Sequence, residues 1–171
     1  MSNKPRAGDD MPELDLPAVA GGNVHIGGRD RWQLVVAYRG KHCPICKRYL
    51  KGLEELKDEY AAQEVEIVAI SGDPLEKAEP DVAEMGLTFP VGYGLSPAQM
   101  HELGLYVSHP RSEQETDRDF NEPGLFVVNP DGQLQIVDIS NAPFARPDLK
   151  GILNGISFIR ERGYPIRGTA E

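Results

Sequence analysis

The order of apolar runs and amphipathic segments predicts an α/β protein with three layers (α/β/α) around a mixed central sheet. Two buried strands alternate with helices in the first half of the chain, and a β-hairpin followed by a helix closes the second half. The chain has 171 residues, 40% of them hydrophobic, which is enough for one packed core and too few for two ordinary domains. We therefore expect one domain over residues 1–171.

The N-terminal quarter predicts a short hairpin and then the first strand of the sheet. Residues 1–10 are polar, and we expect them to be flexible. Residues 14–26 hold short apolar pieces broken by Pro17 and by two glycines, which indicates an N-terminal hairpin extension. Residues 32–38 are apolar without alternation, which is typical of a strand buried on both faces.

A long amphipathic helix is predicted from Pro44 onward. Apolar residues recur there at helical spacing, while Lys51 and Glu55 lie on the polar side. The apolar positions are Ile45, Tyr49, Leu53, Leu56 and Tyr60. A second apolar strand follows at residues 65–70.

The middle of the chain predicts shorter elements. Asp73 can cap a helix that begins at Pro74, and Pro80 should kink it or divide it into two pieces before Met85. A brief strand is expected at residues 89–91. The capping-box spacing from Ser96 predicts another short helix, which Gly104 would terminate.

The C-terminal part begins with a polar stretch, residues 108–121, that we expect to be a long loop. The apolar runs at residues 125–128 and 134–139 flank the turn Asn-Pro-Asp-Gly and predict a β-hairpin. Helical spacing of leucines and isoleucines from Leu149 then predicts a last helix that ends at Gly163.

Composition narrows the function. The net charge is −9 and the pI is near 4.9, which argues against nucleic acid or an anionic membrane surface as the main partner. We find neither an apolar leader nor a stretch long enough to span a membrane, so we expect a cytoplasmic protein. The two cysteines, three positions apart, indicate a redox or metal motif of the cytosolic kind.

The chemistry concentrates where the first central strand meets the long helix. Cys43 lies at the predicted helix N-terminus and Cys46 one turn inside, a spacing that allows a disulfide between them. The helix dipole, Arg39, Lys41 and a protonated His42 would stabilise a thiolate and lower the pKa of Cys43. His42 is also a candidate proton acceptor beside the exposed nucleophile.

Metal binding and inert thiols are the alternatives. A zinc site needs four ligands, and His25, His42, His101 and His109 show no spacing of a second ligand pair. Copper delivery through both thiolates with His101 or His109 is a further possibility. We favour redox chemistry with no metal and no cofactor, and keep a metal-binding or redox-inactive interaction module as the second hypothesis.

The segment Tyr38-Arg39-Gly40-Lys41-His42-Cys43-Pro44-Ile45-Cys46 resembles the active site of the peroxiredoxin-like branch of the alkyl hydroperoxide reductase and thiol-specific antioxidant family. Residues 124–129 and 141–146 resemble the late strand and following turn of that family, so the resemblance covers about residues 11–162. It implies a thioredoxin-like fold with an N-terminal extension, an antioxidant role and, as in many relatives, a homodimer.

The resemblance also implies roles for single residues. The family places Pro, Thr and its peroxide-reactive Cys where this chain has Arg39, Cys43 and Cys46, and its Arg before the late strand is here Pro123. These departures weaken the case for a peroxidase. Thioredoxins have a proline at the position of Pro123, usually after a cis bond, so Glu122–Pro123 is our candidate cis bond. Arg146 matches an Arg of the family and is a candidate substrate-binding residue with Arg39 and Lys41.

Together these features predict a thiol-disulfide oxidoreductase that reduces hydroperoxides or protein disulfides by forming a Cys43–Cys46 disulfide. A thiol reductant of the thioredoxin or glutathione type would reset it, with neither nucleic acid nor membrane as partner. Position favours Cys43 as the first attacker and Cys46 as the resolving thiol, whereas the peroxiredoxin correspondence makes Cys46 the peroxide-reactive residue. The sequence leaves this order open.

Overall fold

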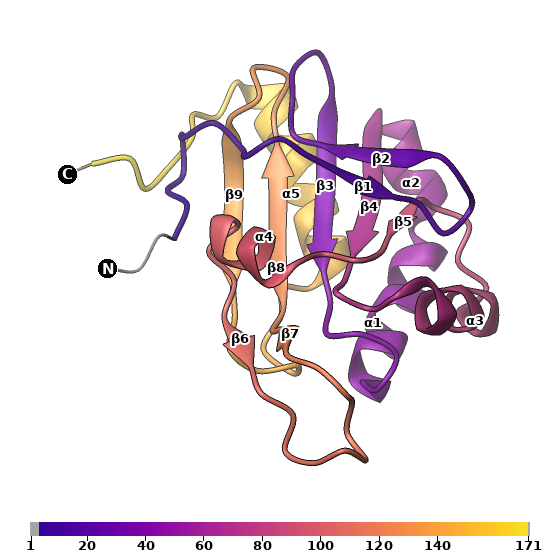
Figure 1. The fold of residues 1–171 in the computed structure, drawn as a ribbon. Helices are drawn as coiled ribbons and strands as arrows, with labels where there is room; N and C mark the ends of the chain where they lie inside the picture. The colour runs from indigo at the N-terminus through magenta and orange to yellow at the C-terminus, as the bar shows by residue number, and fades with distance from the viewer. Residues whose placement is uncertain (1–3, 171) are drawn as a thin grey trace.

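A five-stranded mixed sheet forms the middle of the computed structural model, which describes residues 4–170 (Figure 1). The strand order is β5-β4-β3-β8-β9. Strands β3 (Trp32–Ala37), β4 (Val65–Ile70) and β5 (Val91–Gly92) are parallel, while β8 (Gly124–Val128) and β9 (Leu134–Ile139) add the antiparallel pairs. The predicted mixed sheet and its closing hairpin are confirmed.

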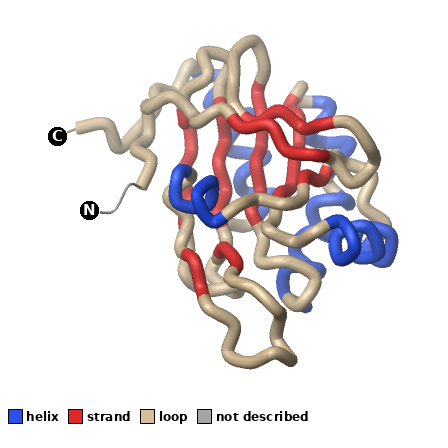
Figure 2. The backbone as a smooth tube through the Cα atoms, viewed as in Figure 1, coloured by secondary structure: helices blue, strands red, loops and turns tan. Residues whose placement is uncertain are grey.

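Alternating side chains of the buried strands divide the core into two clusters, one on each face of the sheet. Leu34 and Val36 of β3 belong to one cluster, and Val35 and Ala37 belong to the other. Helices α1, α2 and α5 cover the first face, whereas the N-terminal hairpin and α4 cover the second (Figures 1 and 2). The three predicted layers are therefore present, and the thinner outer layer is partly a hairpin.

The long helix expected from Pro44 is two helices, α1 (Pro44–Glu55) and α2 (Lys57–Ala62), so that prediction is wrong. Leu56 has φ −94° and ψ −1°, and its N–H donates to the Leu53 carbonyl instead of the carbonyl four residues back. The break lets α2 pack Tyr60 into the core, where the Tyr60 hydroxyl donates to the Leu149 carbonyl at 2.7 Å. The same apolar spacing serves both helices because both bury against one cluster.

Helix α3 (Leu75–Met85) is continuous through Pro80, contrary to the expected kink or division. Pro80 and Glu76 lie on the exposed side, so water can bond the Glu76 carbonyl that loses its helical partner. Pro74 occupies the N-cap position, and the side chain of Asp73 bonds elsewhere. The predicted cap at Asp73 is therefore wrong.

The remaining predicted elements are confirmed with small shifts of their bounds. The N-terminal hairpin consists of β1 (Leu14–Pro17) and β2 (Asn23–Ile26). Helix α4 (Pro97–Glu102) has the predicted capping box between Ser96 and Gln99. Helix α5 (Leu149–Arg162) begins where the Asp148 carboxylate accepts the Gly151 N–H, and ends at Gly163 in the left-handed conformation.

Two segments differ from the expected loops. The polar stretch is held at its base by the short pair β6 (Val107–Ser108) and β7 (Phe120–Asn121), from which a loop extends beyond the sheet (Figure 2). Residues 1–3 of the expected flexible N-terminus lie outside the described residues, while Gly8 and Asp10 pair with the β8–β9 hairpin at Leu134 and Gln133. Among the helices of residues 4–170, we find none with the length and apolar character needed to cross a membrane.

Candidate functional site

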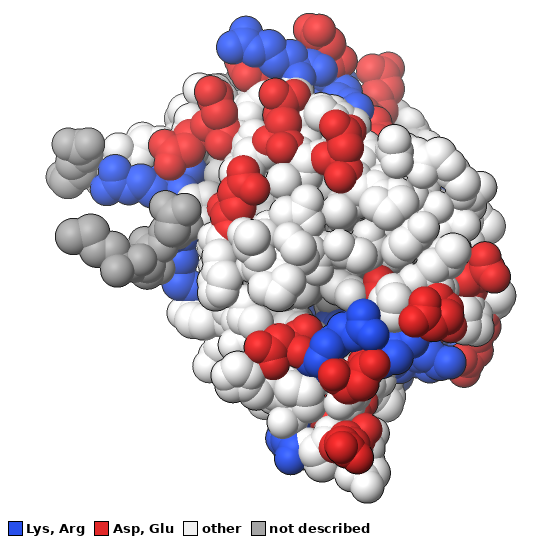
Figure 3. All heavy atoms as spheres, viewed as in Figure 1, with Lys and Arg blue, Asp and Glu red and all other residues white. Residues whose placement is uncertain are grey.

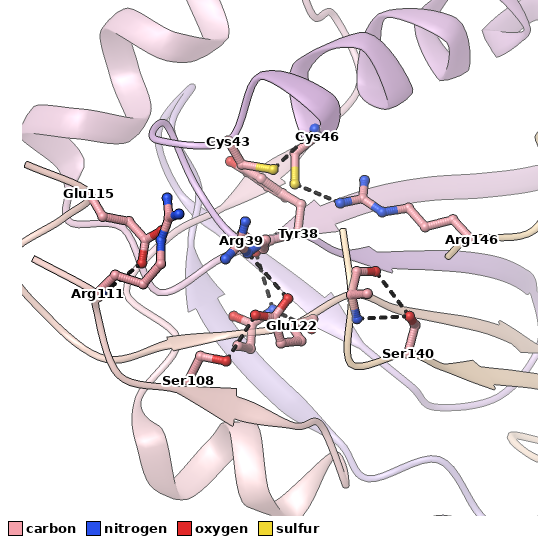
Figure 4. A network of polar contacts seen from close by, with 12 residues as sticks. Tyr38, Arg39, Cys43, Cys46, Ser108, Arg111, Glu115, Glu122, Ser140 and Arg146 are labelled. Atoms are coloured by element: carbon pink, nitrogen blue, oxygen red, sulfur yellow. Dashed lines mark hydrogen bonds and ion pairs between the residues drawn. The ribbon is translucent and has the colours of Figure 1, made fainter. Parts of the chain in front are cut away.

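Chain segments from three strands meet at one edge of the sheet. Strands β3 and β4 are parallel and both end there, and β8 begins there because Ala37 pairs with Gly124 in the antiparallel ladder. The loop after β3 therefore leads into α1 beside the segment that precedes β8. This edge carries the cysteines and most of the predicted site residues (Figure 4).

The loop before α1 is fixed against the loop after β4. Gly40 has φ +134°, and a Cβ there would lie 2.6 Å from Oδ1 of Asp73. The other carboxylate oxygen of Asp73 accepts the Lys41 backbone N–H at 2.8 Å. This contact sets the entry of the chain into α1, and it requires glycine at position 40.

The two cysteines lie on the first turn of α1, as the spacing predicts. Cys43 is the N-cap, and its sulfur accepts the Cys46 backbone N–H at 3.3 Å, in the place where a serine or aspartate oxygen usually serves. Both thiols are free. The expected exposure of Cys43 is wrong, since Cys43 is 2% exposed and Cys46 0%. Both sulfurs pack within the apolar cluster under α1, so a substrate reaches them only after nearby side chains move.

The surroundings of the two sulfurs shift the pKa values of the two thiols in opposite directions. A hydrogen bond from the Cys46 thiol, the Cys46 backbone N–H and the charge of Arg39 lower the pKa of Cys43 to about 6, against the opposing effect of burial. Burial and the same hydrogen bond raise the pKa of Cys46 above that of a free thiol, and the charge of Arg146 opposes this only in part. Of the two thiols, Cys43 therefore ionises more readily.

Arg146 lies against the other sulfur (Figure 4). It comes from the loop between β9 and α5, and its Nη2 is 2.6 Å from Sγ of Cys46. Its guanidinium lies over the ring of Tyr49, 4.8 Å from the centroid, and the Tyr49 hydroxyl donates to the Pro147 carbonyl. The stacking holds the arginine beside Cys46 without a carboxylate partner among residues 4–170.

Arg39 is held on the Cys43 side by a different set of contacts. Its Nε is 3.2 Å from Oε2 of Glu122, whose other oxygen accepts the Ser108 hydroxyl at 2.9 Å. Its guanidinium also lies over the Phe120 ring at 4.7 Å. Only 6% of the Glu122 side chain is exposed, so this ion pair is buried.

His42 and Lys41 line a cavity beside Cys43. The expectation of a protonated His42 is wrong, because burial and the charge of Arg39 lower the pKa of His42 to about 4. Its ring meets Phe120 edge to face, and both ring nitrogens are buried without a hydrogen-bond partner among residues 4–170. A neutral imidazole of such low basicity adds no charge to stabilise the thiolate.

Pro123 lies near Tyr49 and Arg146, on the Cys46 side. Every peptide bond within residues 4–170 is trans, so the expected cis bond between Glu122 and Pro123 is wrong. The chain is extended here and bonded on both sides of the proline, through Glu122 N–H to the Tyr106 carbonyl and Ser140 N–H to the Pro123 carbonyl. No reversal of the chain is needed at this point.

Three side chains hold the two arginines, and the sequence analysis does not assign them this role. They are Glu122, Tyr49 and Phe120. Their roles depend on contacts across the sheet edge, which residue order does not reveal. The adjacency of Glu122 to Pro123 was the one available signal.

For metal binding, residues 4–170 hold no group of three or more histidine, cysteine or carboxylate side chains that could bind an ion.

A model of the AhpC/TSA family matches residues 7–137, which is more than half of the chain. Among curated proteins, the chain is 31% identical over 101 residues to the methylamine utilization protein MauD of Paracoccus versutus, covering 52% of this chain and 50% of MauD. It is 29% identical over 87 residues to the thiol-disulfide oxidoreductase ResA of Halalkalibacterium halodurans, covering 50% and 49%. The chain thus spans about half the length of the curated relatives it matches.

Solved structures show the same fold. A peroxiredoxin-like protein from Aquifex aeolicus superimposes with a TM-score of 0.76 over 90% of this chain and 87% of its own, at 14% sequence identity. At that identity the likeness concerns the thioredoxin-like fold alone.

Proposed function

Because the chain belongs to the AhpC/TSA family, we propose that it is a thiol-disulfide oxidoreductase whose Cys43 and Cys46 alternate between two thiols and one disulfide. The observation that carries the proposal is the placement of both free thiols on the first turn of α1, joined by the hydrogen bond from Cys46 N–H to the Cys43 sulfur. The relative ResA, named as a thiol-disulfide oxidoreductase, supports it.

The lower pKa of Cys43 favours it as the first attacker. Its thiolate attacks one sulfur of a substrate disulfide, the substrate S–S bond breaks, and one substrate thiolate leaves and takes a proton from water. Cys46 then gives its proton to water and attacks the Cys43 sulfur, and the bond between Cys43 and the substrate sulfur breaks. The Cys43–Cys46 bond forms, the second substrate thiolate leaves, and two electrons have passed from the protein to the substrate.

The first step prepares the second. Once Cys43 is bonded to substrate it is no longer an anion, so the hydrogen bond and charge by which Cys43 raised the pKa of Cys46 disappear. Arg146 remains 2.6 Å from the Cys46 sulfur and stabilises the thiolate that forms there. The resolving thiol is thereby activated only when a mixed disulfide is waiting.

Trapping of intermediates tests this order. Reduced Cys46→Ser, mixed with a disulfide that releases a coloured thiol, should accumulate a mixed disulfide at Cys43, visible by intact mass. Cys43→Ser should react far more slowly at the buried, protonated Cys46. Rapid adduct formation in Cys43→Ser with none in Cys46→Ser would reverse the order, and no adduct in either variant would reject the proposal.

Peroxide reduction is a second candidate, which the Arg146 contact favours. In this case the Cys46 thiolate attacks the outer oxygen of the peroxide, the O–O bond breaks, and Cys46 becomes a sulfenic acid. The alkoxide that leaves takes a proton from water. Cys43 then attacks that sulfur, forming the disulfide and releasing water. A sulfenate reagent with hydrogen peroxide should label Cys46 in Cys43→Ser, and labelling in neither single variant would reject peroxidase activity.

The peroxidase candidate must work without three residues of the family pattern, since Arg39, Cys43 and Pro123 stand where the usual Pro, Thr and Arg were expected. We therefore propose disulfide reduction first. A thioredoxin- or glutathione-type thiol reductant, a homodimer, a cytoplasmic location and a role in antioxidant redox balance stay predictions.

A further inference from the structure

A cavity of about 620 Å³ opens on the Cys43 side of the pair, and its lining contains the two chain neighbours of that cysteine, His42 and Pro44. The loop between β6 and β7 forms its other wall. In Figure 4, Arg111 and Glu115 of this loop lie to one side of the cysteines, and Arg146 lies to the other side. A substrate in this cavity therefore lies on the Cys43 side of the pair, and it reaches the buried Cys43 sulfur once nearby side chains move.

Charged groups of both signs line this cavity. Four cations face it in a protein with a net charge of −9, together with two carboxylates. The cations are Arg39, Lys41, Lys77 and Arg111, and the carboxylates belong to Asp73 and Glu115. Figure 3 shows basic and acidic side chains intermingled in the lower part of the face it presents, near α3, whereas several acidic side chains gather in the upper part.

Much of the donor capacity in the cavity is unused. Lys41 is exposed and makes no ion pair within residues 4–170. Arg111 donates to Glu115 through its backbone N–H and its Nε, which leaves the two Nη groups. Lys77 donates to Thr116 and Asp117, which leaves one of its three N–H bonds.

We propose that this cavity binds a small amino-acid or peptide disulfide that carries both carboxylate and ammonium groups. Lys41 binds a carboxylate of this molecule, with Arg111 and Lys77 as further donors. Asp73, which accepts the Lys41 N–H, and Glu115, which accepts from Arg111, face its ammonium group with their remaining lone pairs. The inference rests on the proposed exchange at Cys43 and names its substrate class. Arg39, which is occupied by Glu122, positions the thiolate and is not the main ligand contact.

Two disulfides of different charge test the proposal. Quenched-flow mixing, with an alkylating agent as the quench, gives the rate at which each disulfide oxidises the reduced protein. Oxidised glutathione is the probe that carries carboxylate and ammonium groups, and 2-hydroxyethyl disulfide is the neutral probe. We divide the rate with oxidised glutathione by the rate with 2-hydroxyethyl disulfide. This ratio cancels any change in the nucleophilicity of Cys43. In Lys41→Glu this ratio should fall roughly tenfold at low salt, and the fall should shrink as salt is added.

Lys51→Glu is the matched control, because Lys51 is an exposed lysine of α1 that does not line the cavity beside Cys43. Its ratio should equal that of the wild type. Arg111→Gln gives an independent variant, whose ratio should fall less than that of Lys41→Glu. An unchanged ratio in Lys41→Glu and Arg111→Gln, or an equal fall in Lys51→Glu, would overturn the cavity assignment while disulfide exchange stands. If neither disulfide oxidises the wild-type pair, the proposed function itself fails.

Discussion

Cys43 and Cys46 lie one helical turn apart, and each has an arginine nearby, yet the pKa of one thiol is lowered and that of the other is raised. Cys43 caps α1 and accepts a backbone N–H, while Arg39 near it is shared with the buried Glu122. Cys46 is fully buried and has Arg146 in direct contact. A contact with a guanidinium therefore does not decide which sulfur is ionised, because burial and the proton shared within the pair outweigh it.

The largest expected difference between the two sides concerns stability. Glu122→Gln keeps the acceptor for Ser108 but leaves the charge of Arg39 unpaired in a buried place, so we expect a loss of roughly 3 kcal/mol in the free energy of unfolding. Urea denaturation measures it, with exposed Glu113→Gln as the control. The double variant Arg39→Met, Glu122→Gln should recover part of the loss. Equal stability of Glu122→Gln and wild type would show that the Cys43 side does not depend on this pair.

The shared proton gives the next effect. In the wild type, alkylation of Cys43 should rise with pH through about 6 and then level off, because the thiolate forms above its pKa. Cys46→Ala removes the donated hydrogen bond, so this midpoint should rise and the rate at pH 7 should fall roughly tenfold or more. Cys46→Ser, which keeps a donor, should fall less. Identical pH profiles in the two variants would contradict the assignment of the proton to Cys46.

Removal of Arg146 should have a smaller effect, and only on the reaction of Cys46. Arg146→Met should slow release of the mixed disulfide by Cys46 severalfold, since the thiolate forming there loses its 2.6 Å contact. First attack at Cys43 should change little. Rapid-quench mass spectrometry resolves the two steps, and exposed Arg48→Met serves as the control. Slowing of the first step alone would assign Arg146 to the other sulfur.

The smallest expected effect belongs to His42. With a pKa of about 4, His42 is neutral throughout the pH range in which Cys43 ionises. His42→Asn should therefore shift the alkylation midpoint of Cys43 by less than about 0.3 units, a twofold change in rate. A larger upward shift would show that His42 is a charged partner of the Cys43 thiolate. A larger downward shift would show that it is a basic partner of the Cys43 thiol.

The sequence allowed prediction of the features that local patterns determine. Uninterrupted apolar runs gave the buried strands, and the capping box gave the start of α4. The i, i+3 spacing after a strand placed both cysteines on the first turn of α1. The break at Leu56 was missed because the apolar spacing continues across it, and the continuity of α3 through Pro80 depends on which side of the helix faces water.

The electrostatics of the site could be predicted only in part. A low pKa at Cys43 follows from its place at a helix N-terminus. The burial of both sulfurs, the neutral state of His42 and the pairing of Arg39 with Glu122 arise from side chains far apart in sequence that meet at the sheet edge. These contacts set desolvation, and desolvation cannot be derived from residue order.

The loop between β6 and β7 offers a route to redesign. Its ends are joined by the β6–β7 ladder and by the bond from Glu122 N–H to the Tyr106 carbonyl, while the residues between them supply one wall of the cavity beside Cys43. A graft that replaces residues 109–119 and keeps Ser108 and Phe120 would leave the sheet and the cysteine helix intact. Sequence libraries in this stretch would then allow selection for new disulfide substrates while Cys43 and Cys46 stay unchanged.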